Sequence, residues 1–311
     1  MKNTSLIILK EYPVSIVLDK LLQDKTTKRN IIFATDAYKT EKSDVDKTTE
    51  ITSAMLFSLD AISIQPRVHK TLEKQTERTK KKAEVFTPVW ICNRMNNHCD
   101  EEWFGRKNVF NTEQGKNWTI TDGKIEFPKK KTWKQYVDSK RLEITCGEAP
   151  YIVSRYDAVS GNPIHLQKRI GILDRKLRIV NENAETEEVW LKWVYRAFQS
   201  VYGYEFQGDN LLIARINLLM TFVEYMQDRW RRIPTKKELE KIANIITWNI
   251  WQMDGITGMV PFCSNKTKQC NLFEFALYNT MGEVNENVPC ECRIFDWRSK
   301  RSLVFNSIKN K

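Results

Sequence analysis

Three short segments of the chain each place an acidic residue near the end of an apolar, extended run. The first, LEITCG, contains Glu143 and Gly147, the second, VYGYEF, contains Glu205, and the third, NIWQMD, ends in Asp254. At the carboxyl ends of α/β strands, a glycine turn lets the backbone approach a nucleotide-like cofactor, and an acidic side chain accepts its ribose hydroxyls. Each segment alone is a common strand-to-helix turn. Their succession predicts a cofactor site.

The elements that position these residues alternate between strand and helix. Strands are expected at 141–145, 201–206 and 246–254. Residues 186–202 carry an apolar stripe at helical spacing, and 208–230 read as a second long helix. The stripe consists of Val189, Trp190, Trp193, Val194, Ala197, Phe198 and Val201. Thr235 followed by Glu238 resembles a capping box at a further helix start. This alternation indicates βαβ units and a parallel sheet, hence an α/β fold.

The N-terminal part has a different pattern. Residues 1–64 are expected to form an N-terminal arm and a short helix, with the polar stretch up to about residue 50 loosely tied to the rest. The main domain is expected over 65–311. Within it, Lys70 to Lys82 predicts a basic helix that is either a solvated face or a phosphate-contacting surface. Asp122-Gly123, between alternating runs, predicts a hairpin turn.

Composition narrows the class of protein. Fifty Lys and Arg against 39 Asp and Glu give a net charge of +11, which favours contact with a polyanion or serves only solubility. No apolar run approaches the roughly 20 residues that a membrane-spanning helix needs, and no signal peptide is expected. The odd number of cysteines, seven, favours reduced thiols in a cytoplasmic protein. Four cysteines could bind zinc, but their spacing lacks a C-x-x-C pair, which favours free or buried thiols. These four are Cys263, Cys270, Cys290 and Cys292.

The segments around the acidic residues resemble a known family, the N6-adenine DNA methyltransferases of restriction-modification systems, in particular chains identified as restriction endonuclease subunit M. The likeness covers roughly residues 65–260. Phe86-Thr87-Pro88 looks like the family's Phe/Tyr-Thr-Pro element, which lies against the methionine part of S-adenosylmethionine. Residues 143–151 are similar to the Asp-Pro-x-x-Gly-x-Gly-x-Phe turn. Glu205 falls where the family binds the ribose, and Asp254 resembles the residue that meets the adenine ring.

The resemblance implies a Rossmann-like S-adenosylmethionine-dependent methyltransferase sheet with an N-terminal, mostly helical extension. It implies S-adenosylmethionine as cofactor, no metal, and cofactor contacts from ten residues. These are Phe86, Thr87, Pro88, Glu143, Thr145, Cys146, Gly147, Glu205, Phe206 and Asp254. Double-stranded DNA is the expected substrate.

The sequence departs from the family pattern in several places. Ala149 replaces the second glycine of the turn, and Ile144 replaces its proline. About sixty residues separate Gly147 from Glu205, well above a usual connection, which implies an insertion near 155–185. The family's Asn/Asp-Pro-Pro-Tyr/Phe loop, which holds the flipped adenine, occurs nowhere in the 311 residues. Residues 249–252 (NIWQ) offer an amide and an aromatic but no prolines, so no catalytic residue is assigned.

Two interpretations remain, and both place the chain in a restriction-modification or phage-defence system. In the first, it is the cofactor-binding subunit of a split DNA adenine-N6 methyltransferase, and a second protein subunit supplies the catalytic loop and target recognition. The chain stops soon after CRIFDWRSKRSLVFNSI, about where the strand feeding that loop is expected. In the second, it is a noncatalytic, methyltransferase-like DNA-binding or scaffolding subunit. An S-adenosylmethionine-dependent enzyme acting on RNA or protein is a third, weaker alternative.

Overall fold

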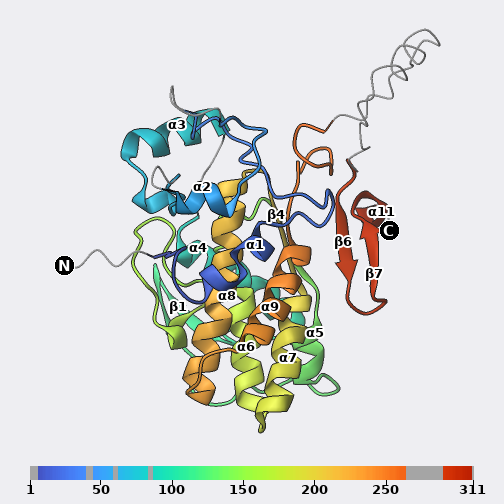
Figure 1. Cartoon of the computed structure of the whole chain (residues 1–311). Coiled ribbons are helices and arrows are strands. Elements are labelled where there is room, and N and C mark those ends of the chain that lie inside the picture. The colour runs from blue at the N-terminus through green and yellow to red at the C-terminus, as the bar shows by residue number, and fades with distance from the viewer. Residues whose placement is uncertain (1–5, 40–44, 59–61, 83–86, 264–289, 310–311) are drawn as a thin grey trace, which may run out of the picture.

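A three-stranded parallel sheet lies at the centre of the fold (Figure 1). The computed structural model describes residues 6–39, 45–58, 62–82, 87–263 and 290–309. The strands β3 (Arg141–Glu143), β4 (Val201–Glu205) and β5 (Ile250–Gln252) are ordered β3-β4-β5. Arg141 pairs with Val201 and Gly203 with Ile250. The predicted mixed fold with a parallel sheet is confirmed at this level.

Helices connect the three strands. Between β3 and β4 lie α6 (Ile172–Asn183) and α7 (Glu187–Gln199), and between β4 and β5 lie α8 (Gly208–Trp230) and α9 (Lys236–Asn249). Both expected long helices are therefore present. The capping box at Thr235 is also confirmed, since its hydroxyl accepts from the Glu238 backbone and the Glu238 side chain accepts from the Thr235 backbone.

The strand predicted at 246–254 is shorter in the structure and begins only at Ile250. Residues 246–249 continue α9, because Ile242, Ile246 and Asn249 lie on its buried face, and only Ile250–Gln252 is extended. A short apolar run does not distinguish helix from strand by itself. Here the helical spacing of the preceding apolar residues decides the outcome.

The N-terminal segment is packed against the sheet, so the expectation of a loosely tied arm is wrong. Helix α1 (Val14–Leu22) contacts α9, and Ile31, Phe33 and Ile51 are fully buried. A side chain on Gly208 would place its Cβ 1.9 Å from the Ile32 carbonyl oxygen. Glycine at the start of α8 therefore allows the N-terminal backbone to lie directly against the β4–α8 connection.

Further helices follow the N-terminal segment: α2 (Ser53–Phe57), the 3-10 turn η1 (Arg67–His69), α3 (Leu72–Lys82) and α4 (Val89–Phe104). The predicted short helix and the predicted basic helix correspond to α2 and α3. Helix α5 (Trp133–Asp138) precedes β3 and has a capping box at Thr132. In Figure 1, α2 and α3 lie at the opposite end of the molecule from the lower ends of α6, α7 and α8.

A hairpin lies just before the predicted one, and the hairpin predicted around Asp122-Gly123 is not formed. Strand β1 (Asn111–Gln114) pairs antiparallel with β2 (Asn117–Ile120), and Gly115, at a φ of 63°, lies in the turn. Asp122-Gly123 follows the hairpin instead. The Arg178 guanidinium donates hydrogen bonds to the carbonyls of Thr121 and Gly123. These bonds hold residues 121–123 against α6, and residues 122–128 form no strand.

The 155–185 region, expected as an insertion, contains the 3-10 turn η2 (Leu166–Lys168) and α6. Leu173, Leu177 and Val180 of α6 are buried in the main core. Arg155 forms an ion pair with Glu224 of α8, 2.9 Å away. The region is therefore part of the packed crossover between β3 and β4.

The C-terminal residues form a separate hairpin of β6 (Arg293–Asp296) and β7 (Arg301–Val304), followed by the short helix α11 (Asn306–Lys309) (Figure 1). A second apolar cluster joins this hairpin to Tyr204 and Trp251 of the sheet. None of the helices in the described ranges is long and apolar enough to span a membrane.

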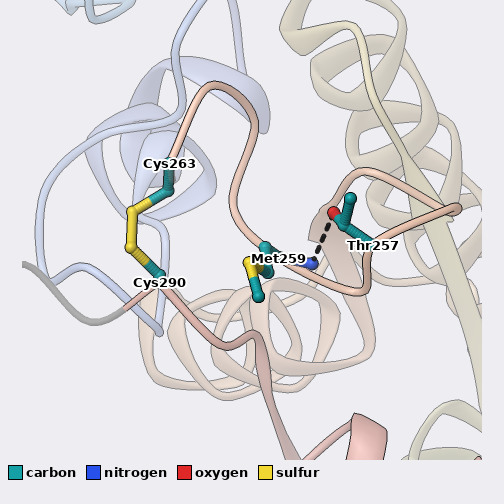
Figure 2. Close-up of a disulfide and its surroundings, with 4 residues drawn as sticks. All are labelled: Thr257, Met259, Cys263 and Cys290. Carbon is teal, nitrogen blue, oxygen red and sulfur yellow. Dashed lines mark hydrogen bonds between the residues drawn. A yellow bond between two sulfur atoms is a disulfide. The ribbon is translucent and has the colours of Figure 1, made fainter. Parts of the chain in front are cut away.

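Two of the four tail cysteines form a disulfide. Cys263 and Cys290 are joined, with their Cα atoms 5.5 Å apart (Figure 2). The Val260 N–H donates to the Cys290 carbonyl and brings the two segments together. The expectation of reduced thiols is therefore wrong for this pair. Cys292 is a free, buried thiol, Cys270 lies outside the described residues, and no metal-binding group occurs within the ranges the structure describes.

Candidate functional site

A cavity of about 860 Å³ opens at the carboxyl ends of β3 and β4. Its walls come from the turn after β3, the β4–α8 connection, α4 and the segment just before α4. Seven of the residues expected to contact a cofactor line it together. They are Thr87, Glu143, Thr145, Cys146, Gly147, Glu205 and Phe206. The acidic strand ends and the glycine turn predicted from the sequence thus share one cavity.

The turn after β3 owes its shape to three left-handed residues. Thr145, Gly147 and Ala149 have φ of 45°, 54° and 65°. Ala149, which stands where the resemblance expects a glycine, adopts this conformation while fully buried. The Cys146 N–H donates to the Tyr204 carbonyl, which anchors the turn on β4.

Glycine at position 203 lets the turn approach β4 closely. A Cβ there would lie 3.2 Å from the Cys146 sulfur and would press against it. Burial raises the pKa of the Cys146 thiol well above its usual range, with the Glu143 and Glu205 carboxylates adding to the effect. Cys146 is therefore a packing residue of the turn and not an activated nucleophile.

Glu205 links the ends of the two strands. Its carboxylate accepts the Gly147 N–H at 2.9 Å and the Gln207 N–H at 3.0 Å. The first bond reaches the β3 turn and the second reaches the residue before α8. Carboxylate oxygens can each accept more than one hydrogen bond, so Glu205 is chemically suited to receive a pair of ligand hydroxyls as well.

One carboxylate oxygen of Glu143 receives no hydrogen bond from the described residues. Its Oε1 lies 3.4 Å from the Tyr151 N–H, whereas its Oε2 is buried and has no hydrogen-bond partner in the described part of the chain. Burial raises the pKa of Glu143 well above its usual range, and the nearby Glu205 carboxylate raises it further. An unpaired buried acceptor is destabilising.

Asp254 does not join the cavity. Its Oδ1 accepts the Ile256 N–H at 2.8 Å and the Thr257 N–H at 3.3 Å, which folds the chain back after β5. Pro88 is the N-cap residue of α4 and does not line the cavity either. Phe86 lies outside the described residues. The structure thus places Glu143 and Glu205 together and Asp254 apart from them.

Several lining residues were missed by the sequence reasoning. Asn210 lies in the first turn of α8, close behind Glu205, and its proximity to that strand end was an available signal. Asn96 and Tyr151 meet through the Asn96 amide, which donates to the Tyr151 carbonyl at 3.0 Å. They come from segments 55 residues apart, and no local pattern joins them.

A buried charge cluster holds the basic helix α3 beside the cavity. Asp209, in the first turn of α8, accepts from Tyr38, Lys70 and Arg78, all at 2.8 to 2.9 Å. Burial alone would raise the pKa of Asp209, but Lys70 and Arg78 outweigh it and hold the pKa well below the ordinary value. Arg78 of α3 and Lys70, which lies just before that helix, therefore join this region to α8. Because Arg78 is bonded to Asp209, a phosphate contact from α3 would have to come from the other basic residues of that helix.

Comparisons with known protein families, curated proteins and solved structures return no match for this chain. The chemistry of the site consequently rests on its geometry. Two acidic side chains, a left-handed turn and a helix start face one cavity large enough for a nucleotide-sized ligand. This arrangement suits binding of a ligand that carries both hydroxyls and a cationic nitrogen.

Proposed function

We propose that this chain binds S-adenosylmethionine in the cavity between the ends of β3 and β4. The observation that carries the proposal is the convergence of Glu143, the turn around Gly147 and Glu205 on one cavity of about 860 Å³. In open α/β sheets, ligands bind outside the carboxyl ends of the strands, which is where this cavity lies.

The residues present fit the cofactor. Glu205 would accept the ribose hydroxyls, and Glu143, the other carboxylate in the lining, would face the ammonium group of the methionine part. Thr87 and Phe206 lie in the same lining and supply further contacts. When bound, the cofactor supplies a sulfonium methyl group for transfer. The protein's own contribution would be to bind and orient the cofactor.

Within this proposal, the chain is the cofactor-binding subunit of a DNA adenine-N6 methyltransferase of a restriction-modification or phage-defence system. A partner chain would supply the loop that holds the adenine, since no Asn/Asp-Pro-Pro-Tyr/Phe sequence occurs in the 311 residues. The net charge of +11 supports double-stranded DNA as the substrate.

The second candidate function is a noncatalytic, methyltransferase-like scaffold of a defence complex. The missing catalytic loop favours it as well. The two candidates differ in turnover and not in cofactor binding. A scaffold would leave adenine unmethylated even when the complete complex is assembled.

Two measurements test the proposal. Calorimetric titration of the purified chain with S-adenosylmethionine and with S-adenosylhomocysteine is expected to give one site per chain. The absence of binding at millimolar cofactor would refute the proposed site. Transfer of a labelled methyl group to double-stranded DNA is then measured with the chain alone and with the products of the adjacent reading frames. Methylated adenine only in the presence of an adjacent product would support the split enzyme. No methylated adenine in either reaction would support the noncatalytic scaffold.

A further inference from the structure

The disulfide between Cys263 and Cys290 joins two residues that are both partly exposed (Figure 2). A dithiol in solution can therefore reach this bond. Cys292, the free cysteine nearest to it in the sequence, is buried, and its thiol donates to the Gln252 carbonyl at 3.4 Å. Burial also raises the pKa of the Cys292 thiol well above its usual range, so this residue supplies no thiolate to attack the disulfide.

Backbone hydrogen bonds hold the loop after β5 only as far as Val260. The Asp254 N–H donates to the Met259 carbonyl, and the Val260 N–H donates to the Cys290 carbonyl, both at 2.8 Å. Beyond Val260, the one backbone bond found among the described residues stays within the turn, from the Cys263 N–H to the Val260 carbonyl. The disulfide is therefore the link that fixes the far end of this turn to the segment before β6.

Phe262 has an unfavourable backbone conformation in this turn. It follows Pro261 at the third position of the four-residue turn from Val260 to Cys263, and its φ is 62°. A turn with proline at its second position and a positive φ at its third is of type II, which normally requires glycine at that third position. A strained residue keeps such a conformation only while its surroundings enforce it. Here the enforcing link is the disulfide at the next residue.

The Phe262 ring supports a wall of the proposed cofactor cavity. It meets the Phe206 ring edge to face, with 5.5 Å between the two ring centroids, and the Lys47 Nζ lies 5.2 Å from the Phe262 centroid. Phe206 lines the cavity, whereas Phe262 does not. Phe262 is therefore a positioning residue, which holds the Phe206 side chain in place without facing the ligand.

We propose that the Cys263–Cys290 disulfide is a redox switch for the contact between Phe262 and Phe206, and thereby for the affinity of the cavity for its ligand. With the bond formed, the turn holds Phe262 against Phe206. When a dithiol reduces the bond, residues 261–263 are released, Phe262 relaxes from its positive φ, and the aromatic contact is lost. The effect on ligand affinity rests on the proposed function, whereas the release of the turn does not.

The reduction is a two-electron exchange between a dithiol and the disulfide. A thiolate of the dithiol attacks one of the two cysteine sulfurs, the S–S bond breaks, and a mixed disulfide forms. The second thiol of the reductant then displaces the cysteine sulfur from the mixed disulfide. The reductant leaves as a cyclic disulfide, and its two electrons and two protons end on the Cys263 and Cys290 thiols.

Four variants separate the disulfide from the aromatic contact. The combined change Cys263→Ser and Cys290→Ser represents the reduced chain, and Cys99→Ser, which removes a partly exposed free thiol, is its control. Phe262→Ala keeps the disulfide and removes the aromatic contact. Its control is Ile256→Ala, at a residue of the same loop that is 94% exposed. Peptide mapping verifies the disulfide, and thermal unfolding verifies that every variant is folded.

Two measurements need no ligand. Hydrogen exchange at the Val260 and Cys263 amides is expected to be faster in the serine variant than in the oxidised wild type, with no change at Met253, whose amide bonds to β4. The second measurement is a double-mutant cycle of Phe206→Leu and Phe262→Ala. Their effects on the free energy of unfolding should be coupled in the oxidised chain and additive in the serine variant, because only side chains in contact are coupled.

Calorimetric titration with S-adenosylmethionine measures the effect on the cavity. The reduced wild type, the serine variant and Phe262→Ala are each expected to bind about tenfold more weakly than the oxidised wild type, within the usual range of coupling between two sites. Cys99→Ser and Ile256→Ala should bind normally. Because coupling is reciprocal, saturating cofactor should also raise by about tenfold the ratio of dithiol to its oxidised form that reduces half of the chains.

Three outcomes would overturn the inference: a disulfide that joins other cysteines, equal hydrogen exchange in the oxidised chain and the serine variant, or equal cofactor affinity in the two redox states. Absence of cofactor binding by every form would refute the proposed site instead. The double-mutant cycle then decides the switch independently. Additive effects of Phe206→Leu and Phe262→Ala in the oxidised chain would refute it, and coupling that disappears on reduction would support it.

Discussion

The ends of β3 and β4 differ from the end of β5 in the way their acidic residues are used. Glu143 and Glu205 face a common cavity, and one of their oxygens has no donor among the described residues. Asp254, at the end of β5, satisfies one oxygen with two backbone amides of its own turn. Similar sequence signals can therefore lead to a shared cavity at two strand ends and only to local backbone bonds at the third.

The largest effect on this comparison is expected from Gly147→Val, which should abolish measurable binding of S-adenosylmethionine. Valine is strained at a φ of 54°, and a backbone that relaxes this strain would no longer present the N–H that Glu205 accepts. Gly115→Val places the same residue at a φ of 63° in the β1–β2 turn and is the control. If the two variants bind the cofactor equally well, the turn is not part of the binding site.

Glu205→Ala is expected to weaken cofactor binding by about 100-fold. The change removes an acceptor for ligand hydroxyls and leaves the Gly147 and Gln207 amides without their carboxylate, at a cost of roughly 1–3 kcal/mol for each lost bond. Calorimetric titration measures the affinity. Glu205→Gln, which keeps one acceptor oxygen, should lie between the alanine variant and the wild type. Unchanged affinity in the folded alanine variant would place the ribose elsewhere.

Glu143→Gln should weaken cofactor binding by about tenfold, since a neutral amide attracts a ligand ammonium less strongly than a carboxylate does. The same variant should change the pH dependence of stability. Because the pKa of Glu143 is raised in the folded chain, the folded state binds more protons than the unfolded state above about pH 4.5, and this residue makes stability fall as pH rises.

The unliganded Glu143→Gln variant should therefore lose this contribution. Its melting temperature should exceed that of the wild type by a margin that grows from pH 5 upward and levels off above the folded pKa of Glu143. Thermal unfolding between pH 5 and 9 measures the difference. A margin that is constant with pH would mean that Glu143 titrates normally and that its buried oxygen has a donor.

The smallest effect is expected from Asp254→Asn. Asparagine retains a side-chain oxygen for the Ile256 and Thr257 amides, so stability should change by less than about 1 kcal/mol. Cofactor affinity should be unchanged because Asp254 does not line the cavity. A clear loss of affinity in this variant would mean that the end of β5 also belongs to the binding site, and the three strand ends would then not differ in function.

The sequence predicted the parts of the molecule that depend on local order along the chain. Glu143, Gly147 and Glu205 each follow an extended apolar run, and parallel pairing alone was enough to bring them together. Thr235 and Glu238 predicted the start of α9 because a capping box joins residues only three positions apart in the sequence.

The sequence could not predict features set by distant contacts. Asn96 is held at the cavity by its bond to Tyr151. The segment where a hairpin turn was predicted bonds to Arg178 of α6 instead. The N-terminal arm looked unstructured because its buried residues, such as Phe33, are spaced irregularly. Asp254 carried the same signal as Glu205, and each accepts the N–H two residues further on, but only Glu205 lines the cavity.

The contact between Gly208 and Ile32 has a practical consequence for dissecting this protein. The carbonyl of Ile32 lies where a side chain on Gly208 would be, and the Gly208 N–H donates to the adjacent Phe33 carbonyl. Cutting the chain at residue 64 would remove both partners from the start of α8, two residues after Phe206. A fragment of residues 65–311 would therefore be a poor substitute for the whole chain in ligand titrations, and a negative result from it would report damage to the scaffold.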